Sequence, residues 1–195
     1  DKNTKKNFKN KLIFCAASTH YNEELFIGKI HKELKLKYNN LLTIIIPRHI
    51  NRSNSIINEL ENINLKIVTR SSKQKVSKNT DIYIADTYGE SSKFYRLSKI
   101  TFLGGSLVNH GGQNPLEPAR MGNYIIHGPN IQNFKEVYNM LSKLNISSKV
   151  NNIINMKKIV NKKIKYKQPS KIIRKLNFLG SDILKKNLNE INKYF

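Results

Sequence analysis

The sequence alternates between short, uninterrupted apolar runs and longer segments whose apolar residues recur about every 3.6 positions. An uninterrupted run fits a strand buried on both faces, whereas the helical spacing fits an amphipathic helix. Strands are expected at Lys11–Ala17, Leu41–Ile46, Lys66–Thr69, Ile82–Ala85, Ile100–Leu103 and Tyr124–His127, and helices at Asn22–Leu36, Asn51–Ile63, Gly89–Leu97, Leu116–Met121 and Asn133–Leu144. This order predicts an α/β fold, a doubly wound parallel sheet with helices on both faces.

The C-terminal part of the chain, from Ser147 onward, is rich in Lys and Asn but keeps helical apolar spacing. We expect helices at Asn151–Lys165 and Ser170–Phe195, separated by a break at Gln168–Pro169. No internal repeat is apparent, and we place no domain boundary. Residues 1–195 are therefore interpreted as one domain with C-terminal helices from about residue 151.

A glycine-rich stretch, Gly104–Pro118, follows the fifth predicted strand. In doubly wound folds ligands bind beyond the carboxyl ends of the strands. Four glycines lead to Asn114–Pro115, a pair typical of a helix start. Backbone N–H groups in such a loop suit a phosphate, and Glu117, one turn into the helix, can accept hydrogen bonds from ribose hydroxyls. The stretch predicts a nucleotide site; the alternative is a turn that only packs a strand on a helix.

Other polar residues follow other predicted strands. They would meet at the same edge of the sheet, beyond the carboxyl ends of the strands, which we call the rim. Arg48 follows a buried strand and has a donor geometry suited to phosphate or a base edge. Glu90 opens a helix and could either bind a ligand or cap the helix. His20, His49 and His110 are expected as hydrogen-bonding rim residues, without the spacing of metal ligands. No Walker lysine motif, GxGxxG fingerprint or nucleophile elbow is present, and we predict no metal and no cofactor.

The formal net charge of +22 is compatible with nucleic acid, an acidic membrane surface or phosphorylated substrates as partners. An alternative interpretation needs no partner: the charge would follow from a general preference for Lys, Asn and Ile along the chain. The single cysteine, Cys15, excludes an internal disulfide and is expected in the core. No signal peptide or membrane-spanning run is visible.

Four segments together resemble a known family. They are AASTHYNEE (16–24), IIIPRH (44–49), DTYGESSKFYRLSKITFLGGS (86–106) and GGSLVNHGGQNPLEPARMGNYIIHGPNIQNF (104–134). In order and spacing they resemble the C-terminal half of the bacterial Kdo transferases. These are GT-B glycosyltransferases that move 3-deoxy-D-manno-octulosonic acid (Kdo) from CMP-Kdo to lipid A precursors. The resemblance runs from about Leu12 to Leu141.

The resemblance implies a Rossmann-like donor domain of an inverting glycosyltransferase. It places CMP contacts at Pro47, Arg48, Tyr88, Gly89, Glu90, Asn114, Pro115, Leu116 and Glu117. Further rim contacts are expected at Ser18, His20, Gly105, Ser106 and His110. Three positions depart from the family pattern: Tyr88 for Met, Asn109 for Pro, and Gln113 for His.

The resemblance also implies a setting in lipopolysaccharide core biosynthesis, at the cytoplasmic face of the bacterial inner membrane. The partners would be CMP-Kdo, a lipid A precursor and an acidic membrane surface. The family's N-terminal acceptor domain, with its general base, precedes the matched region. We therefore assign no catalytic residue and expect this chain alone to be inactive.

Two alternatives stay open. One is another GT-B transferase or sugar-nucleotide epimerase that uses a uridine nucleotide. The other is a basic nucleic-acid-binding protein. Because the lysines are spread along the chain rather than clustered with aromatic residues, we expect no nucleic-acid partner.

Overall fold

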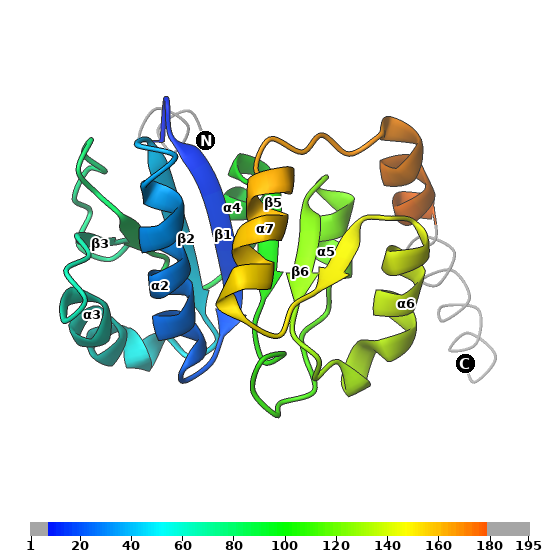
Figure 1. The fold of residues 1–195 in the computed structure, drawn as a ribbon, viewed down its shortest axis with the longest axis horizontal. Helices are drawn as coiled ribbons and strands as arrows, with labels where there is room; N and C mark the ends of the chain where they lie inside the picture. The colour runs from blue at the N-terminus through cyan, green and yellow to red at the C-terminus, as the bar shows by residue number, and fades with distance from the viewer. Residues whose placement is uncertain (1–7, 179–195) are drawn as a thin grey trace, which may run out of the picture.

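The computed structural model describes residues 8–178, which form a seven-stranded parallel sheet with the order β3-β4-β2-β1-β5-β6-β7 (Figure 1). The strands are β1 (Leu12–Thr19), β2 (Leu41–Pro47), β3 (Ile67–Thr69), β4 (Ile82–Ile84), β5 (Ile100–Leu103), β6 (Tyr124–His127) and β7 (Ser147–Lys149). The six predicted strands are confirmed. β7 was not predicted, because Ser-Ser-Lys contains no apolar run; this edge strand is held by parallel pairing with β6.

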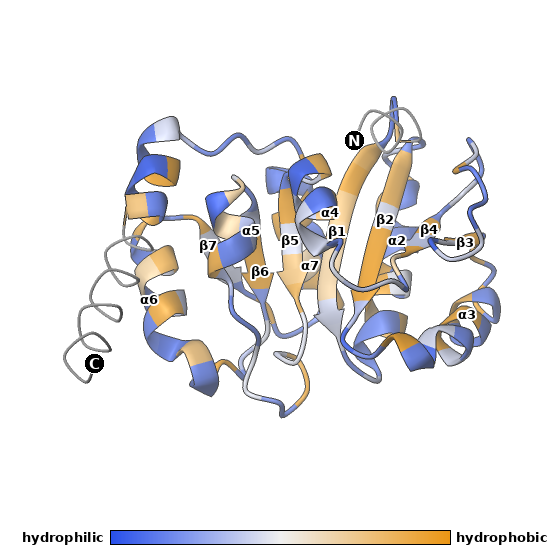
Figure 2. Cartoon of the chain, turned by 180° about the vertical axis from the view of Figure 1, so that it is seen from behind, coloured by the Kyte–Doolittle hydropathy of each residue, from blue (hydrophilic) through white to orange (hydrophobic). Residues whose placement is uncertain are grey.

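Helices cover both faces of the sheet, as predicted. They are α2 (Glu23–Lys35), α3 (Ser53–Glu61), α4 (Ser91–Leu97), α5 (Leu116–Arg120), α6 (Lys135–Lys143) and α7 (Ile153–Lys163), with short 3-10 turns η1 (Ile50–Arg52) and η2 (Gln132–Phe134). Buried side chains of α2, α3 and α7 share one apolar cluster with the sheet, and those of α4, α5 and α6 share the other. Figure 1 looks onto α2 and α7, and Figure 2 onto α4 and α5.

The continuous apolar runs have a direct structural cause, which β1 illustrates. Successive strand residues point to opposite faces of the sheet. Phe14 and Ala16 therefore belong to the cluster under α2, while Cys15 and Ala17 belong to the cluster under α4. All four side chains are fully buried, so no polar residue alternates with them. The core position predicted for Cys15 is confirmed.

The C-terminal prediction is confirmed as far as the structure describes the chain. The expected helix at Asn151–Lys165 corresponds to α7, whose first turn is capped by the Asn152 side chain, which accepts from the Asn155 N–H at 2.9 Å. Helical backbone resumes at Ser170 and continues through residue 178. The remainder of the predicted helix to Phe195 lies outside the described residues.

The strand order reverses between β1 and β5. On one side of β1 lie β2, β4 and the edge strand β3, and on the other side lie β5, β6 and β7. In open α/β sheets, a ligand crevice forms at such a switch point, beyond the carboxyl ends of the two strands. The segments after β1 and β5 therefore define the place where a site is expected.

Candidate functional site

The predicted rim forms because the segments after the strands lie side by side along one edge of the sheet. The Arg48 N–H donates to the Thr19 carbonyl at 3.0 Å, joining the ends of β2 and β1. The Gly104 N–H donates to Ala17 O at 2.8 Å, joining the ends of β5 and β1. The Asn130 N–H donates to Ser106 O at 2.9 Å. These bonds connect polar segments that are far apart in sequence.

A buried carboxylate, Glu23, occupies the centre of this rim at the β1/β5 crevice. Its oxygens accept hydrogen bonds from the backbone N–H groups of Gly105 at 2.7 Å, Ser106 at 3.1 Å and Leu107 at 3.0 Å. The N–H of His20 donates to the same carboxylate at 3.0 Å. Burial raises the pKa of Glu23, and the four N–H donors oppose that shift. The side chain from α2 thus fixes the first half of the glycine-rich loop.

This arrangement corrects the prediction that the loop backbone receives a phosphate. The N–H groups of Gly105, Ser106 and Leu107 are already hydrogen-bonded to Glu23. At two glycines, the backbone lies against another segment of the protein rather than against an open space. A Cβ at Gly104 would overlap the Ser18 carbonyl oxygen. A Cβ at Gly128 would overlap the backbone of Ser106. For this half of the loop, the packing alternative is the correct one.

Two of the expected rim contacts, Ser18 and Ser106, also have local structural roles. The fully buried Ser106 hydroxyl donates to Leu103 O and accepts from the Gly128 N–H at 2.8 Å. Ser18 has a positive φ of 54° at an irregularity where β1 pairs with β2. The Ser106 side chain therefore faces the protein interior rather than a ligand.

The second half of the loop leads into α5 where a helix was predicted, but the N-cap residue is Pro115 rather than Asn114. The Asn114 Oδ1 accepts a hydrogen bond from the Leu116 N–H at 3.0 Å, at the start of the helix. The Tyr138 hydroxyl donates to Gln113 O at 2.8 Å and ties the loop to α6. Glu117 is exposed and lines a hollow of about 520 Å³ together with Arg96 of α4 and Arg120 of α5. Its carboxylate makes no hydrogen bond or ion pair within residues 8–178.

Glu90, at the start of α4, is held by a cluster of donors. The Arg70 guanidinium, just after β3, donates from Nε at 2.8 Å and from Nη2 at 3.0 Å. Lys93 Nζ donates at 2.8 Å and the Thr87 hydroxyl at 2.6 Å. The Arg70 bonds, with those of Lys93 and Thr87, lower the pKa of Glu90 far below its usual range. Its side chain makes no cap hydrogen bond, so the capping alternative is wrong.

The two residues before Glu90 form an open surface. The Tyr88 side chain is 78% exposed. Gly89 has a φ of +76°, and nothing lies within 4 Å of the position that a Cβ would occupy. Pro47 is buried as the last residue of β2, whereas Arg48 is exposed, with no side-chain hydrogen bond or ion pair among the described residues.

The three rim histidines gather over the crevice. The rings of His20 and His110 stack with centroids 4.2 Å apart, and the His49 ring stands edge-on to His20 at 6.1 Å. Burial, reinforced by His110, His49, Arg52 and Arg48, lowers the pKa of His20 to about 4.

Four charged residues of the rim were not predicted from the sequence: Glu23, Glu24, Arg52 and Arg70. Glu90 and Glu117 were the rim glutamates expected from the sequence, but Glu23 and Glu24 lie there as well. Glu24 is fully buried and pairs with Arg52 through two hydrogen bonds of 2.9 and 3.2 Å. The available signal was two adjacent acids opening a helix directly after a buried strand. No comparable sequence pattern indicated Arg70, the partner of Glu90.

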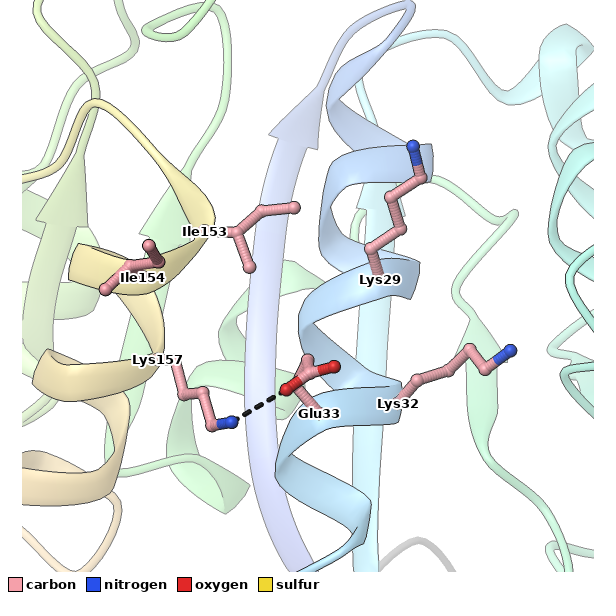
Figure 3. A pocket seen from close by; sticks show the side chains of 6 residues that line it. All are labelled: Lys29, Lys32, Glu33, Ile153, Ile154 and Lys157. Carbon is pink, nitrogen blue, oxygen red and sulfur yellow. Dashed lines mark hydrogen bonds and ion pairs between the residues drawn. The ribbon is translucent and has the colours of Figure 1, made fainter.

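A second hollow, of about 560 Å³, lies between α2 and α7, away from the predicted site residues (Figure 3). It is lined by Lys29, Lys32, Glu33, Ile153, Ile154 and Lys157. The Lys157 ammonium and the Glu33 carboxylate point toward each other across it and form an ion pair at 2.7 Å. This hollow contains none of the residues predicted to bind a nucleotide.

Two general properties of the described residues bear on the class of site. Within residues 8–178, no group of three or more His, Cys, Asp or Glu side chains could hold a metal ion. In the same range, no helix is both long and apolar enough to cross a bilayer.

Comparisons with known proteins give one consistent match. No family model matches the chain. The 3-deoxy-D-manno-octulosonic acid transferase of Haemophilus influenzae is 41% identical over 129 residues, which are 66% of this chain and 30% of the relative. The enzyme of the same name from Rickettsia conorii is 38% identical over 122 residues, 63% of this chain and 26% of the relative. The chain thus spans less than a third of the length of these curated relatives.

A solved structure covers the same region. The C-terminal CMP-Kdo binding domain of WaaA from Acinetobacter baumannii matches with a TM-score of 0.72 and 30% identity, over 79% of each chain. The matched fold is the α/β sheet described above, and the resemblance seen in the sequence motifs is confirmed. This chain therefore belongs to the family of the 3-deoxy-D-manno-octulosonic acid transferases, as a C-terminal domain of the WaaA type.

Proposed function

We propose that this chain is the donor-binding half of a Kdo transferase and holds the nucleotide of CMP-Kdo at the rim. The observation that carries the proposal is the contrast among the rim charges. Glu23, Glu24 and Glu90 are all engaged by the protein itself. Arg48 and Glu117, both exposed, have no side-chain partner within residues 8–178. They are the charged groups best placed to meet a ligand.

Each of the two residues suits one part of the nucleotide. The Arg48 guanidinium can donate two hydrogen bonds to the phosphate and stabilise the charge that develops as CMP leaves. The Glu117 carboxylate can accept from ribose hydroxyls. The open surface at Tyr88 and Gly89, beside the clamped Glu90, suits the base. Asn114, Pro115 and Leu116 position Glu117 at the start of α5, where the Asn114 side chain accepts from the Leu116 N–H.

We extend this proposal to the reaction of the whole protein. The transfer would be inverting, from CMP-Kdo to a lipid A precursor, at the cytoplasmic face of the inner membrane. The charge of +22 favours contact with an acidic membrane surface. An in-line transfer needs an acceptor hydroxyl and a base beside the donor carbon. We assign neither to this chain and infer that it does not transfer Kdo by itself.

The Glu117→Ala variant tests the nucleotide site. A hydrogen bond to a charged group contributes about 1.5–3 kcal/mol, so CMP binding measured by calorimetry should weaken roughly 10- to 150-fold. The matched control is Glu61→Ala, which removes another exposed glutamate at the far end of α3. An unchanged CMP affinity with Glu117→Ala would contradict the proposal. So would a loss of the folded circular-dichroism spectrum, which would indicate a structural role for Glu117.

A further inference from the structure

The histidine cluster over the β1/β5 crevice has no assigned role in nucleotide binding. It consists of His20, His49 and His110, which come from the segments after β1, β2 and β5. The His20 and His110 rings are nearly parallel, at 21°, while the His49 ring is nearly perpendicular to His20, at 88°. The Nε2 atom of His20 is buried and has no hydrogen-bond partner. The cluster therefore presents an unsatisfied polar atom at the switch point of the sheet.

The charges that face this cluster are positive or already neutralised. Arg48 and Arg52 both act on His20, together with the other two histidines. Arg52 is paired with Glu24 at 2.9 Å. The Glu23 carboxylate, which the His20 backbone N–H contacts, is saturated by backbone donors. Apart from the imidazole nitrogens, which can donate or accept according to the tautomer, the side chains around the cluster are cationic or already paired, which favours a negatively charged ligand group.

We propose that His20, His49 and His110, with Arg48 beside them, form the subsite for the carboxylate of the transferred sugar acid. This inference rests on the proposed function. In an octulosonic acid, the carboxylate is attached to the anomeric carbon, which also carries the phosphate in the activated donor. Two anionic groups therefore lie side by side at the reacting carbon. Arg48 lies at the phosphate side, and the histidines extend the donor surface toward β5.

The subsite predicts a linkage between binding and protonation. His20 is kept neutral because burial and the neighbouring cations disfavour its charged form. A carboxylate bound against the ring supplies a negative charge that favours the protonated form, so the pKa of His20 should rise on binding. Protons are then taken up when the sugar acid binds at a pH between the pKa values of His20 in the free and bound chain, and not when the nucleotide alone binds.

Calorimetry with cytidine, CMP and CMP-Kdo separates the contributions of base, phosphate and sugar acid. We expect His110→Gln and His49→Gln, both exposed positions, to weaken CMP-Kdo binding about tenfold and CMP binding less than about twofold. Lys29→Gln is the control, because it removes a positive charge from an exposed side chain of α2 that lines the distant hollow (Figure 3). Equal losses for CMP and CMP-Kdo would assign the histidines to the phosphate and overturn the proposal.

Imidazole ¹⁵N NMR gives a second readout that does not depend on affinity. CMP-Kdo should shift the resonances of His20, His49 and His110 beyond the shifts caused by CMP. His31, which is buried against Thr43 and Asp81 in another part of the fold, should stay unchanged. If CMP binds but the three resonances respond to CMP and CMP-Kdo alike, the carboxylate subsite is wrong while the nucleotide site stands. Failure of CMP to bind at all would overturn the proposed function itself.

Discussion

At the scale of single residues, Glu23 determines the shape of the glycine-rich loop. A carboxylate that accepts from three successive backbone N–H groups does for the loop what a bound anion would do. The loop is therefore ordered before any ligand arrives. Glycine supplies the positive φ of 65° at Gly105 that brings these N–H groups together.

The Glu23→Gln variant should destabilise the protein by about 1–3 kcal/mol, because the new amide group leaves buried N–H donors without an acceptor. For a domain of this size, the melting temperature falls by about 2–4 °C per kcal/mol. Glu33→Gln on the same helix is the control, since its exposed pair with Lys157 contributes little. Equal melting temperatures for the two variants, measured by calorimetry, would refute the anchoring role of Glu23.

The pKa of His20 predicts how stability depends on pH. Because its pKa is lowered from 6.5 to about 4 in the folded chain, the unfolded chain binds more protons between these values. Its contribution to stability is complete above pH 6.5 and is lost as the pH falls toward 4. His31 and His127, whose pKa values burial also lowers, act in the same direction.

We therefore expect the His20→Gln variant to show a smaller drop in melting temperature between pH 7 and about pH 4.5 than the unaltered chain. Thermal denaturation followed by circular dichroism at several pH values measures this difference. Parallel curves for the two proteins would mean that His20 titrates normally in the folded state.

At the scale of elements, strands whose side chains are buried on both faces were predictable from sequence. β2 is an apolar run interrupted only by Thr43, and every residue in it is buried, which fits a central strand covered on both faces. β7 was missed because edge pairing through the backbone requires no particular side chain. The rim also followed from the sequence, since the position of a polar segment after a strand fixes the edge on which it lies.

The partners within the rim could not be predicted in the same way. Gly105 and Glu23 are 82 positions apart, and Arg70 reaches Glu90 from the end of a three-residue strand. No local pattern encodes such a contact, because it depends on how two loops meet in space. The same limit explains why the loop N–H groups were assigned to a phosphate: their actual acceptor belongs to another element.

Glycine substitutions in the loops test the close packing of these elements. Gly104→Ala and Gly128→Ala each place a Cβ against backbone atoms of a neighbouring segment, so either should destabilise the fold by about 1–3 kcal/mol. Gly89→Ala is the contrast: its Cβ meets open space, and only the positive φ costs about 1 kcal/mol. Chemical denaturation measures all three. If Gly89→Ala were the most damaging of the three, the packing account would be wrong.

At the scale of the whole molecule, the sheet order assembles one binding edge from separate loops. The segments after β4 and β2 bring the Glu90 cluster and Arg48 to one side of the switch point. The histidines stand over the crevice between β1 and β5, and Glu117 lies beyond it at the start of α5. In the proposed function, the base, the phosphate and the sugar would lie in sequence along this edge.

Calorimetric titration of the chain with CMP and with UMP tests the central claim most directly. The two nucleotides share ribose and phosphate and differ at the polar edge of the base, where the amino donor and ring-nitrogen acceptor of cytosine are replaced by a carbonyl acceptor and an N–H donor in uracil. A site built for cytidine leaves a polar group unpaired with UMP, so CMP should bind about tenfold more tightly. Equal affinity for the two nucleotides, or tighter binding of UMP, would contradict the assignment of this chain as a CMP-sugar-binding domain.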